Sequence, residues 1–250
     1  MLSNSNRMAV RLMPCDVLAR VGSVARGAVD ELEIEVARQL AAMGSPVATL
    51  DPRVEPGVYV HGGFGVTLWT YYEPASAQAI EPGPYAEALA RFHAGMREVH
   101  VGAPHFTDRV AEAERLVGDR AATPDLGDAD RELLLFALQS LTSSILERGT
   151  AEQLLHGEPH PGNVLSTKRG LLFVDLETCC RGPVEFDVAH APEEVSAHYP
   201  EIDQSLVGEC RMLMRAMVAA WRWDREDRFP NGRRMGTELI SELRTALDAP

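Results

Sequence analysis

Residues 156–189 read HGEPHPGNVLSTKRGLLFVDLETCCRGPVEFDVA, and this stretch carries the densest group of polar functional side chains in the chain. Its first eight residues contain two histidines, a glutamate and an asparagine, together with two prolines and two glycines. Because proline and glycine disfavour a regular helix, we predict a structured loop here. Loops that carry many polar side chains are where binding and catalytic residues concentrate.

Two apolar segments follow this loop and predict a β-hairpin. Residues 164–166 and 171–174 flank the polar turn 167–170. The hairpin would place Asn163 at its entrance and Asp175 at its exit, so that an amide oxygen and a carboxylate meet at one edge. Because Mg²⁺ prefers hard oxygen ligands and keeps several waters, this pair predicts a magnesium site.

Two other interpretations of the loop remain open. The spacing of His156, Glu158 and His160 is superficially similar to a zinc motif, but the metalloprotease motif lies on a helix and its spacing differs. The zinc deaminase motif needs a downstream Pro-Cys-x-x-Cys, where residues 178–181 of this chain read TCCR. A purely structural loop, with buried histidines and a capping carboxylate, is the remaining alternative.

Composition and charge exclude several classes of protein. The 250 residues are 45% hydrophobic and 24% charged, which is typical of a globular protein. A formal net charge of −13 argues against a nucleic-acid partner and is compatible with a cationic small molecule. No segment has the roughly 20 consecutive apolar residues that cross a bilayer, and no secretory pattern starts the chain, so we expect no membrane partner.

The cysteines and lysines give two further expectations. The four cysteines form no CxxC pair, which predicts reduced thiols and a cytoplasmic location. Lys168 is the single lysine of the sequence and lies in the predicted turn 167–170. Any chemistry that needs a lysine must therefore use Lys168 or do without one.

The first 70 residues predict a small sheet that carries one helix. Alternating apolar and polar residues over 8–22 predict an antiparallel hairpin. Helical spacing over 30–43 predicts a helix, with Asp30 as its N-cap and Gly44 as its end. Further strands are predicted at three short apolar segments: 48–50, 58–60 and 66–69.

From residue 73 the pattern becomes mainly helical. The turn-rich stretch PASAQAIEPGP is typical of a hinge or linker. Helices are predicted at five segments: 84–99, 108–118, 130–148, 203–221 and 236–248. A small sheet followed by helices places the chain in the α+β class.

HGEPHPGN, followed by FVDLE and GPVEFDVA, resembles the aminoglycoside phosphotransferase family of the protein-kinase-like superfamily, with three motifs in the family's order. The resemblance covers nearly the whole chain. SNSNRMAVRL is similar to the family's nucleotide loop, and VLARV to the strand with its phosphate-contacting basic residue. ELEIEVARQLAAMGSPV is similar to the helix with the ion-pair glutamate, and PYAEALARFHA to the helix that ends in Leu-His.

The resemblance implies a bilobal protein-kinase-like fold that binds ATP or GTP and Mg²⁺ between its lobes. We expect residues 1–70 to form a small nucleotide-binding β-sheet lobe, which the position of Met1 close to the nucleotide loop would shorten. Residues 71–250 would form the larger, mainly helical catalytic and acceptor-binding lobe. Metal binding would fall to three residues: Asn163, Asp175 and Glu177.

The family's roles carry over to individual residues as expectations. Glu158 would accept the proton of the attacking hydroxyl, while His156 and Asp187 would brace the loop. Arg20 would contact phosphate and pair with Glu33. The nucleotide would contact six residues: Ser5, Asn6, Arg20, Thr70, Tyr71 and Tyr72. Trp69 or Tyr71 would lie beside the adenine ring, unless these aromatic residues belong to the core.

Two positions depart from the family's pattern. Glu158 replaces the usual aspartate, which moves the carboxylate by about 1.5 Å unless the loop compensates, enough to slow catalysis. Arg20 replaces the usual lysine, and its planar guanidinium differs in geometry from an ammonium group. These departures leave open a nucleotide-binding pseudokinase that regulates a partner.

The sequence therefore predicts a phosphotransferase that moves the γ-phosphate to a hydroxyl of a small, amino-containing acceptor such as an aminoglycoside antibiotic. An endogenous metabolite is the alternative acceptor, and the oligomeric state stays open. Four acidic residues could line a site for a cation or simply form a solvated face: Glu193, Glu194, Glu201 and Asp203.

Overall fold

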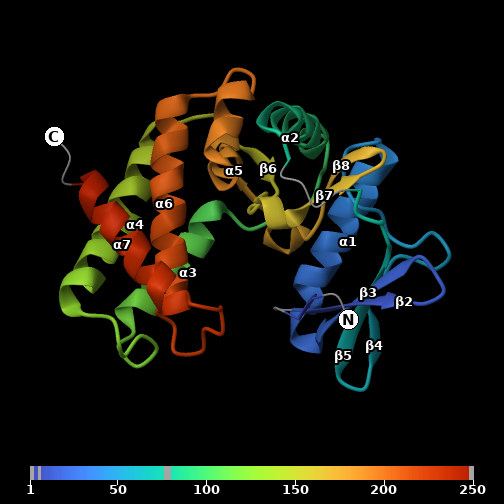
Figure 1. The fold of residues 1–250 in the computed structure, drawn as a ribbon, viewed down its shortest axis with the longest axis horizontal. Helices are drawn as coiled ribbons and strands as arrows, with labels where there is room; N and C mark the ends of the chain where they lie inside the picture. Colours follow the sequence, from blue (N-terminus) through green and yellow to red (C-terminus); the bar gives the residue numbers. More distant parts are fainter. Residues whose placement is uncertain (1–2, 5–6, 76–79, 248–250) are drawn as a thin grey trace. The chain divides into compact units, whose positions relative to one another are not determined.

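The computed structural model describes residues 3–4, 7–75 and 80–247, which fold as a mixed α+β protein (Figure 1). The chain forms two compact units. The first comprises Met1–Ala103, Gln153–Arg181 and Ala191–Pro200, and the second comprises Pro104–Glu152, Gly182–His190 and Glu201–Pro250. This division does not follow a single cut in the sequence, and the lobe boundary predicted at residue 70 stays a prediction.

The first unit contains an antiparallel sheet whose strands lie in the order β1-β2-β3-β5-β4. The strands are β1 (Ser3–Asn4), β2 (Met8–Leu12), β3 (Val17–Ser23), β4 (Tyr59–His61) and β5 (Phe64–Thr70). The predicted hairpin is confirmed, because β2 pairs with β3 from Met8–Val21 to Leu12–Val17. The predicted strand at 48–50 is wrong: Val47 and Leu50 each make one isolated bridge, to different partners, and so form no ladder.

Helix α1 (Gly27–Ala42) lies beside this sheet and begins earlier than predicted. Ser23 accepts a hydrogen bond from the backbone N–H of Ala25 and starts a short 3-10 turn, η1 (Val24–Arg26), which continues into α1. The expectation that Asp30 caps this helix is therefore wrong, because Asp30 lies within the first turn and is buried. Gly44, at a φ of 70°, takes the left-handed conformation that commonly follows a helix end.

The rest of the first unit supports the polar loop. Its remaining elements are α2 (Pro82–Arg97), β6 (Gln153–Leu155), η2 (Pro161–Asn163), β7 (Val164–Thr167), β8 (Gly170–Phe173), η3 (Leu176–Thr178), β9 (Cys180–Gly182) and η4 (Glu193–His198). The second predicted hairpin, over residues 164–174, is confirmed by the pairing of β7 with β8. Tyr85, Phe92 and Met96 of α2 are fully buried, and the Phe92 ring lies 4.8 Å from that of Phe173. This apolar layer fixes α2 to the hairpin that follows the loop.

The second unit is helical. It consists of α3 (Phe106–Gly118), α4 (Asp128–Glu147), α5 (Val184–His190), α6 (Gln204–Arg222) and α7 (Gly232–Leu247). Helix α6 contacts each of α3, α4, α5 and α7, as Figure 1 shows for α4 and α7. The four long helices match their predicted positions within a few residues, whereas the short helix α5 is not among the predicted helices.

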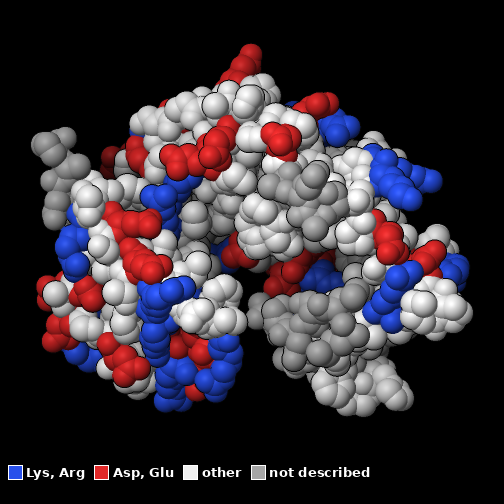
Figure 2. All heavy atoms as spheres, viewed as in Figure 1, with Lys and Arg blue, Asp and Glu red and all other residues white. Residues whose placement is uncertain are grey.

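Surface charge is mixed on the face drawn in Figure 2, where acidic and basic side chains are interspersed. The excess of negative charge in the sequence is therefore not gathered into one acidic patch on that face. Among the helices of the described residues, none is both long enough and apolar enough to span a membrane.

Arg131 of α4 is a buried structural arginine in the second unit. Its Nη1 donates to the Val117 carbonyl at the end of α3 and to Thr123 Oγ1 at 2.8 Å. Its Nη2 donates to the carbonyls of Thr123 and Leu126, at 3.0 and 3.2 Å. The guanidinium thus satisfies backbone groups that α3 and the following loop leave without helical partners.

We expect Arg131→Met to lower the free energy of unfolding by about 3 kcal/mol, because it removes the guanidinium donor from the buried carbonyls of Val117 and Leu126. Thermal denaturation followed by circular dichroism measures this loss. Arg120→Met is the matched control, since Arg120 is 68% exposed and, among the described residues, forms an ion pair with the exposed Asp128. Equal stability of the two variants would contradict the structural role of Arg131.

Candidate active site

His156 opens the polar loop and braces it from the inside. The residue is fully buried, and its ring lies against those of Phe92 and Phe173. Nδ1 accepts the backbone N–H of Glu158 at 3.3 Å, which leaves Nε2 protonated to donate to the Val174 carbonyl at 2.9 Å. Because both ring nitrogens are used to hold backbone, the arrangement favours the predicted bracing role over direct chemistry.

Gly157 brings the loop close to the segment after β8. Its φ is 89°, and a Cβ placed there would lie 2.0 Å from the Thr178 carbonyl oxygen. The Thr178 hydroxyl also donates to the His156 carbonyl at 3.1 Å. Only glycine permits this approach, which fixes the distance between the two parts of the site.

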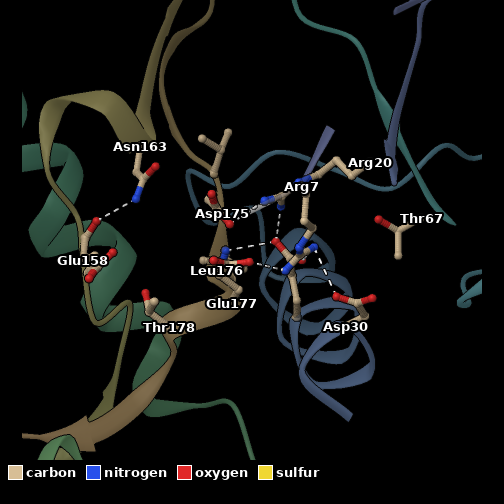
Figure 3. Close-up of polar contacts among 12 residues, drawn as sticks. Arg7, Arg20, Asp30, Thr67, Glu158, Asn163, Asp175, Leu176, Glu177 and Thr178 are labelled. Carbon is tan, nitrogen blue, oxygen red and sulfur yellow. Dashed lines mark hydrogen bonds and ion pairs between the residues drawn. The ribbon is translucent and has the colours of Figure 1, made fainter. Parts of the chain in front are cut away.

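Glu158 and Asn163 lie together on the loop (Figure 3). Asn163 Nδ2 donates to the Glu158 carbonyl at 3.0 Å, and the same carbonyl accepts the backbone N–H of His160 at 2.8 Å. The Asn163 carbonyl accepts the backbone N–H of Val174 at 3.0 Å, which ties the loop to the second strand of the hairpin. The Glu158 side chain is half-buried at this turn.

Asp175 lies across from Glu158 and Asn163 in Figure 3 and faces Arg20. Its backbone is left-handed, with a φ of 65°. Asp175 Oδ1 accepts a hydrogen bond from Arg20 Nη2, and Arg20 Nη1 donates to Glu33 Oε1. The structure thus contains the predicted Arg20–Glu33 ion pair and extends it to Asp175. Burial opposes the charge of Arg20, but Glu33 and Asp175 raise the pKa of its guanidinium above the ordinary value.

Glu33 is fully buried and is held at both oxygens. Oε1 accepts from Arg20 and from the backbone N–H of Leu176 at 3.1 Å, while Oε2 accepts from Arg7. Burial raises the pKa of this carboxyl group, and the guanidinium groups of Arg20 and Arg7 oppose that effect. Hydrogen bonds from these donors replace those that the buried carboxylate no longer makes with water.

Glu177 is held by two arginines that the sequence did not point to. Glu177 Oε2 lies 2.7 Å from Arg7 Nη2 and 2.6 Å from Arg26 Nη2. Arg7 lies between β1 and β2, and Arg26 lies in η1, just before α1. Neither arginine belongs to a sequence motif that indicates burial or a partner. The only signal in the sequence for a cluster of cations here is Glu177 itself, two positions after Asp175.

The donor atoms of Asn163 and Asp175 fit a magnesium ion. After the contacts above, Asn163 Oδ1 and Asp175 Oδ2 carry no hydrogen bond within the described residues, and both are the hard oxygens that Mg²⁺ prefers. Within the described residues, no group of three or more His, Cys, Asp and Glu side chains is arranged to hold a metal. Glu177 fits less well, because two guanidinium groups already bind its Oε2.

The predicted adenine contacts lie at the end of β5, where two of the backbone N–H groups already donate to carbonyls of the chain. The backbone N–H of Thr70 donates to the Thr49 carbonyl at 2.9 Å, and that of Tyr71 donates to the Asp16 carbonyl at 3.0 Å. The Tyr72 hydroxyl lies 2.9 Å from Thr49 Oγ1. Trp69 is 5% exposed and belongs to the core, with its Nε1 donating to Thr67 Oγ1.

The remaining predicted residues lie elsewhere. Ser5 and Asn6 are outside the described residues. Lys168 is exposed in the turn between β7 and β8, as predicted, and therefore cannot replace Arg20. Asp187 is fully buried within α5. Asp203, a candidate for a cation site, instead caps α6 by accepting the N–H groups of Ser205 and Leu206, and it pairs with Arg148.

Comparison with known protein families identifies the family to which this chain belongs. Residues 22–226, well over half of the chain, match the model of the phosphotransferase enzyme family (APH). The chain therefore belongs to this family. The match confirms the predicted family.

Among curated proteins, the chain is 36% identical over 95 residues to methylthioribose kinase of Pectobacterium carotovorum subsp. carotovorum (strain PC1). This match covers 38% of the chain but only 23% of that kinase, so the chain spans less than a quarter of this relative's length.

Two solved structures share the fold. Amicoumacin kinase hAmiN in complex with AMP-PNP, Ca²⁺ and Ami superposes with a TM-score of 0.75 at 13% identity, covering 98% of this chain and 87% of that one. The GDP and kanamycin complex of APH(2″)-IIia gives a TM-score of 0.71 at 16% identity, covering 98% and 92%. At these identities the likeness concerns the fold, and it confirms the predicted kinase-like α+β architecture.

Proposed function

We propose that the protein transfers the γ-phosphoryl group of ATP or GTP to a hydroxyl of a small, amino-containing molecule such as an aminoglycoside. The observation that carries this proposal is the arrangement of Glu158, Asn163 and Asp175, with Arg20 bound to Asp175 and Glu33. Phosphoryl transfer depends mainly on positioning and on charge stabilisation, and this set contains groups for both.

Each residue has a distinct task in this proposal. Glu158 accepts the proton of the attacking hydroxyl. Arg20 stabilises negative charge on the phosphates, and Glu33 orients Arg20 from a fully buried position. Asn163 and Asp175 would hold Mg²⁺, which when bound supplies positive charge to the transferring group. His156 keeps Glu158 in place through the backbone N–H.

The class of acceptor rests on more general arguments. The net charge of −13 favours a cationic acceptor over an anionic one, and the exposed Glu193 and Glu194 of η4 are available to contact an amine. One structural relative is a complex with kanamycin, which supports an aminoglycoside acceptor.

A metabolite kinase is the second candidate, and a specific similarity favours it. The 95-residue match to methylthioribose kinase points to a sugar hydroxyl without an amine as acceptor. Incubation with ATP or GTP, Mg²⁺ and a panel of aminoglycosides, amino sugars, amino alcohols and methylthioribose separates the two candidates. Mass spectrometry reports which acceptor gains a phosphate.

Three outcomes of the panel have different meanings. A phosphorylated amine-bearing acceptor supports the primary proposal. Phosphate transfer to methylthioribose alone favours the metabolite kinase and overturns the antibiotic version. Nucleotide binding without transfer to any acceptor overturns both and favours a regulatory pseudokinase, the possibility raised by Arg20 and Glu158.

We expect Glu158→Asp to retain or raise turnover, because aspartate is the residue that the family usually carries at this position. Glu158→Gln, which removes the proton acceptor at nearly the same size, should lower kcat by about 10²-fold. Steady-state rates with the best acceptor of the panel measure both effects, and the exposed Glu31→Gln serves as control. Loss of turnover in Glu158→Asp would mean that the loop is built around the longer side chain.

A further inference from the structure

Arg7 is a buried arginine to which the proposed chemistry assigns no task. Its side chain is only 4% exposed. Nη1 donates to Glu33 Oε2 and lies 3.4 Å from Asp30 Oδ1, while Nη2 lies 2.7 Å from Glu177 Oε2 (Figure 3). One guanidinium thus joins helix α1 to the segment that follows Asp175.

The sheet leaves space for this side chain at a pair of glycines. Gly22 of β3 and Gly65 of β5 are cross-strand partners. A Cβ at Gly22 would lie 3.4 Å from Arg7 Cγ, and a Cβ at Gly65 would lie 3.6 Å from Asp30 Oδ2. The stem of Arg7 therefore packs against Gly22, where a side chain is missing, and its head reaches Asp30, which lies near Gly65, and Glu177.

Arg7 and Arg20 share Glu33 between them. Arg7 donates to Oε2 and Arg20 donates to Oε1, so the buried carboxylate is fixed from two sides. The second nitrogen of Arg20 binds Asp175, and the second nitrogen of Arg7 binds Glu177. The two arginines thus form parallel links from one glutamate to two carboxylates on the same short segment.

We propose that Arg7 is a positioning residue for phosphoryl transfer: it holds Glu33 against Arg20, and it keeps Glu177 as an anchor for arginines instead of a metal ligand. The proposal rests on the phosphotransfer function given above. For Glu177 to bind a metal, its Oε2 would have to give up Arg7 and Arg26 at a site where the side chain is 11% exposed. Breaking charge-assisted contacts at a site with little access to water costs free energy. The proposed metal site therefore consists of Asn163 and Asp175.

The test compares Arg7→Met, Arg7→Lys, Glu177→Gln and the double variant Arg7→Met/Glu177→Gln. Arg38→Met is the control, because Arg38 is exposed and its ion pair within the part of the chain that the structure describes is with Glu35, which is not a residue of the site. Calorimetry measures the affinity for Mg²⁺-AMP-PNP, and steady-state assays give kcat, nucleotide KM and the Mg²⁺ concentration for half-maximal rate. Thermal denaturation reports folding of each variant.

We expect Arg7→Met to weaken Mg²⁺-AMP-PNP binding about 10-fold and to lower kcat about 30-fold, because Arg20 and Asp175 lose their alignment. Arg7→Lys should recover most of the loss, since it restores the charge. The double variant should be no worse than Arg7→Met, because the two residues act through one contact. Glu177→Gln should leave the Mg²⁺ requirement unchanged.

Two results would overturn the inference. One is that Arg7→Met and the control Arg38→Met have equal nucleotide affinity and equal kcat. Arg7 would then have a structural role alone, even if Arg7→Met lowers the thermal stability. The other is a raised Mg²⁺ requirement in Glu177→Gln alone, which would make Glu177 a metal ligand. If Arg7→Met does not fold, the double variant, which leaves no unpaired charge between these two residues, supplies the same comparison with Arg38→Met.

The calorimetric measurement keeps this inference separate from the proposed function. If the wild-type protein binds nucleotide but phosphorylates no acceptor, the proposed function fails. The effect of Arg7→Met on Mg²⁺-AMP-PNP affinity still decides the role of Arg7: weaker binding than in Arg38→Met supports it, and equal binding refutes it.

Discussion

Asp175→Asn should lower kcat by about 10³-fold and leave the protein folded, which is the largest effect that we expect from a single conservative change. The substitution keeps the shape of the side chain but removes the negative charge that faces Arg20 and that Mg²⁺ needs. Asparagine also tolerates the left-handed backbone at this position, where φ is 65°. The loss should therefore appear in turnover and not in folding.

The measurement is kcat with the best acceptor, alongside thermal denaturation of the same samples. Asp16→Asn is the matched control, because the Asp16 side chain is 75% exposed and its ion pair within the described residues is with Arg11, outside the site. Removal of a key electrostatic group produces a much larger loss than tenfold. If Asp175→Asn keeps more than about a tenth of the wild-type turnover, Asp175 is therefore not part of the metal site.

Gly157→Ala should reduce turnover more than 100-fold, roughly the penalty for misplacing a reacting group by 1 Å, and should also destabilise the fold. A Cβ at this position would meet the Thr178 carbonyl oxygen at 2.0 Å and its carbonyl carbon at 2.8 Å. Because these atoms are backbone, the loop must move as a whole, and Glu158 moves with it. The φ of 89° adds backbone strain for any residue other than glycine.

Gly44→Ala isolates the backbone strain from the steric clash. Gly44 also has a positive φ, 70°, but nothing lies within 4 Å of a Cβ placed there. We expect this control to lower the free energy of unfolding by about 1 kcal/mol with unchanged turnover. Comparable loss of turnover in both variants would show that the close approach at Thr178 is not what positions the loop.

The parts of the site that could be predicted from sequence are those set by local chain geometry. The prolines and glycines of 156–163 predict a loop, and the apolar pattern after it predicts the hairpin of β7 and β8. Together these place Asn163 and Asp175 near each other without knowledge of the rest of the fold. The pairing of Arg20 with Glu33 is equally accessible through the family resemblance.

The buried charges beyond that pair could not be predicted. Arg7 is buried against carboxylates of α1 and of the segment after β8, and Arg26 is partly buried against Glu177 of that segment. These partners lie far along the chain. Asp30 was misread for the same reason: its position before an apolar periodic stretch is typical of an N-cap, but its actual partner is Arg7. Local pattern carries no information about such partners.

The arginine at position 20 has a practical consequence for chemical surveys of nucleotide-binding proteins. Reagents built on acyl phosphates of ATP label a protein by acylating a lysine amine beside the phosphates. The only lysine of this chain is Lys168, which is exposed on the turn between β7 and β8. If the site binds nucleotide as proposed, such reagents should therefore fail to label it even when it is filled with nucleotide. Proteins that use an arginine at this position, as proposed here, would be under-represented in any catalogue assembled by lysine labelling.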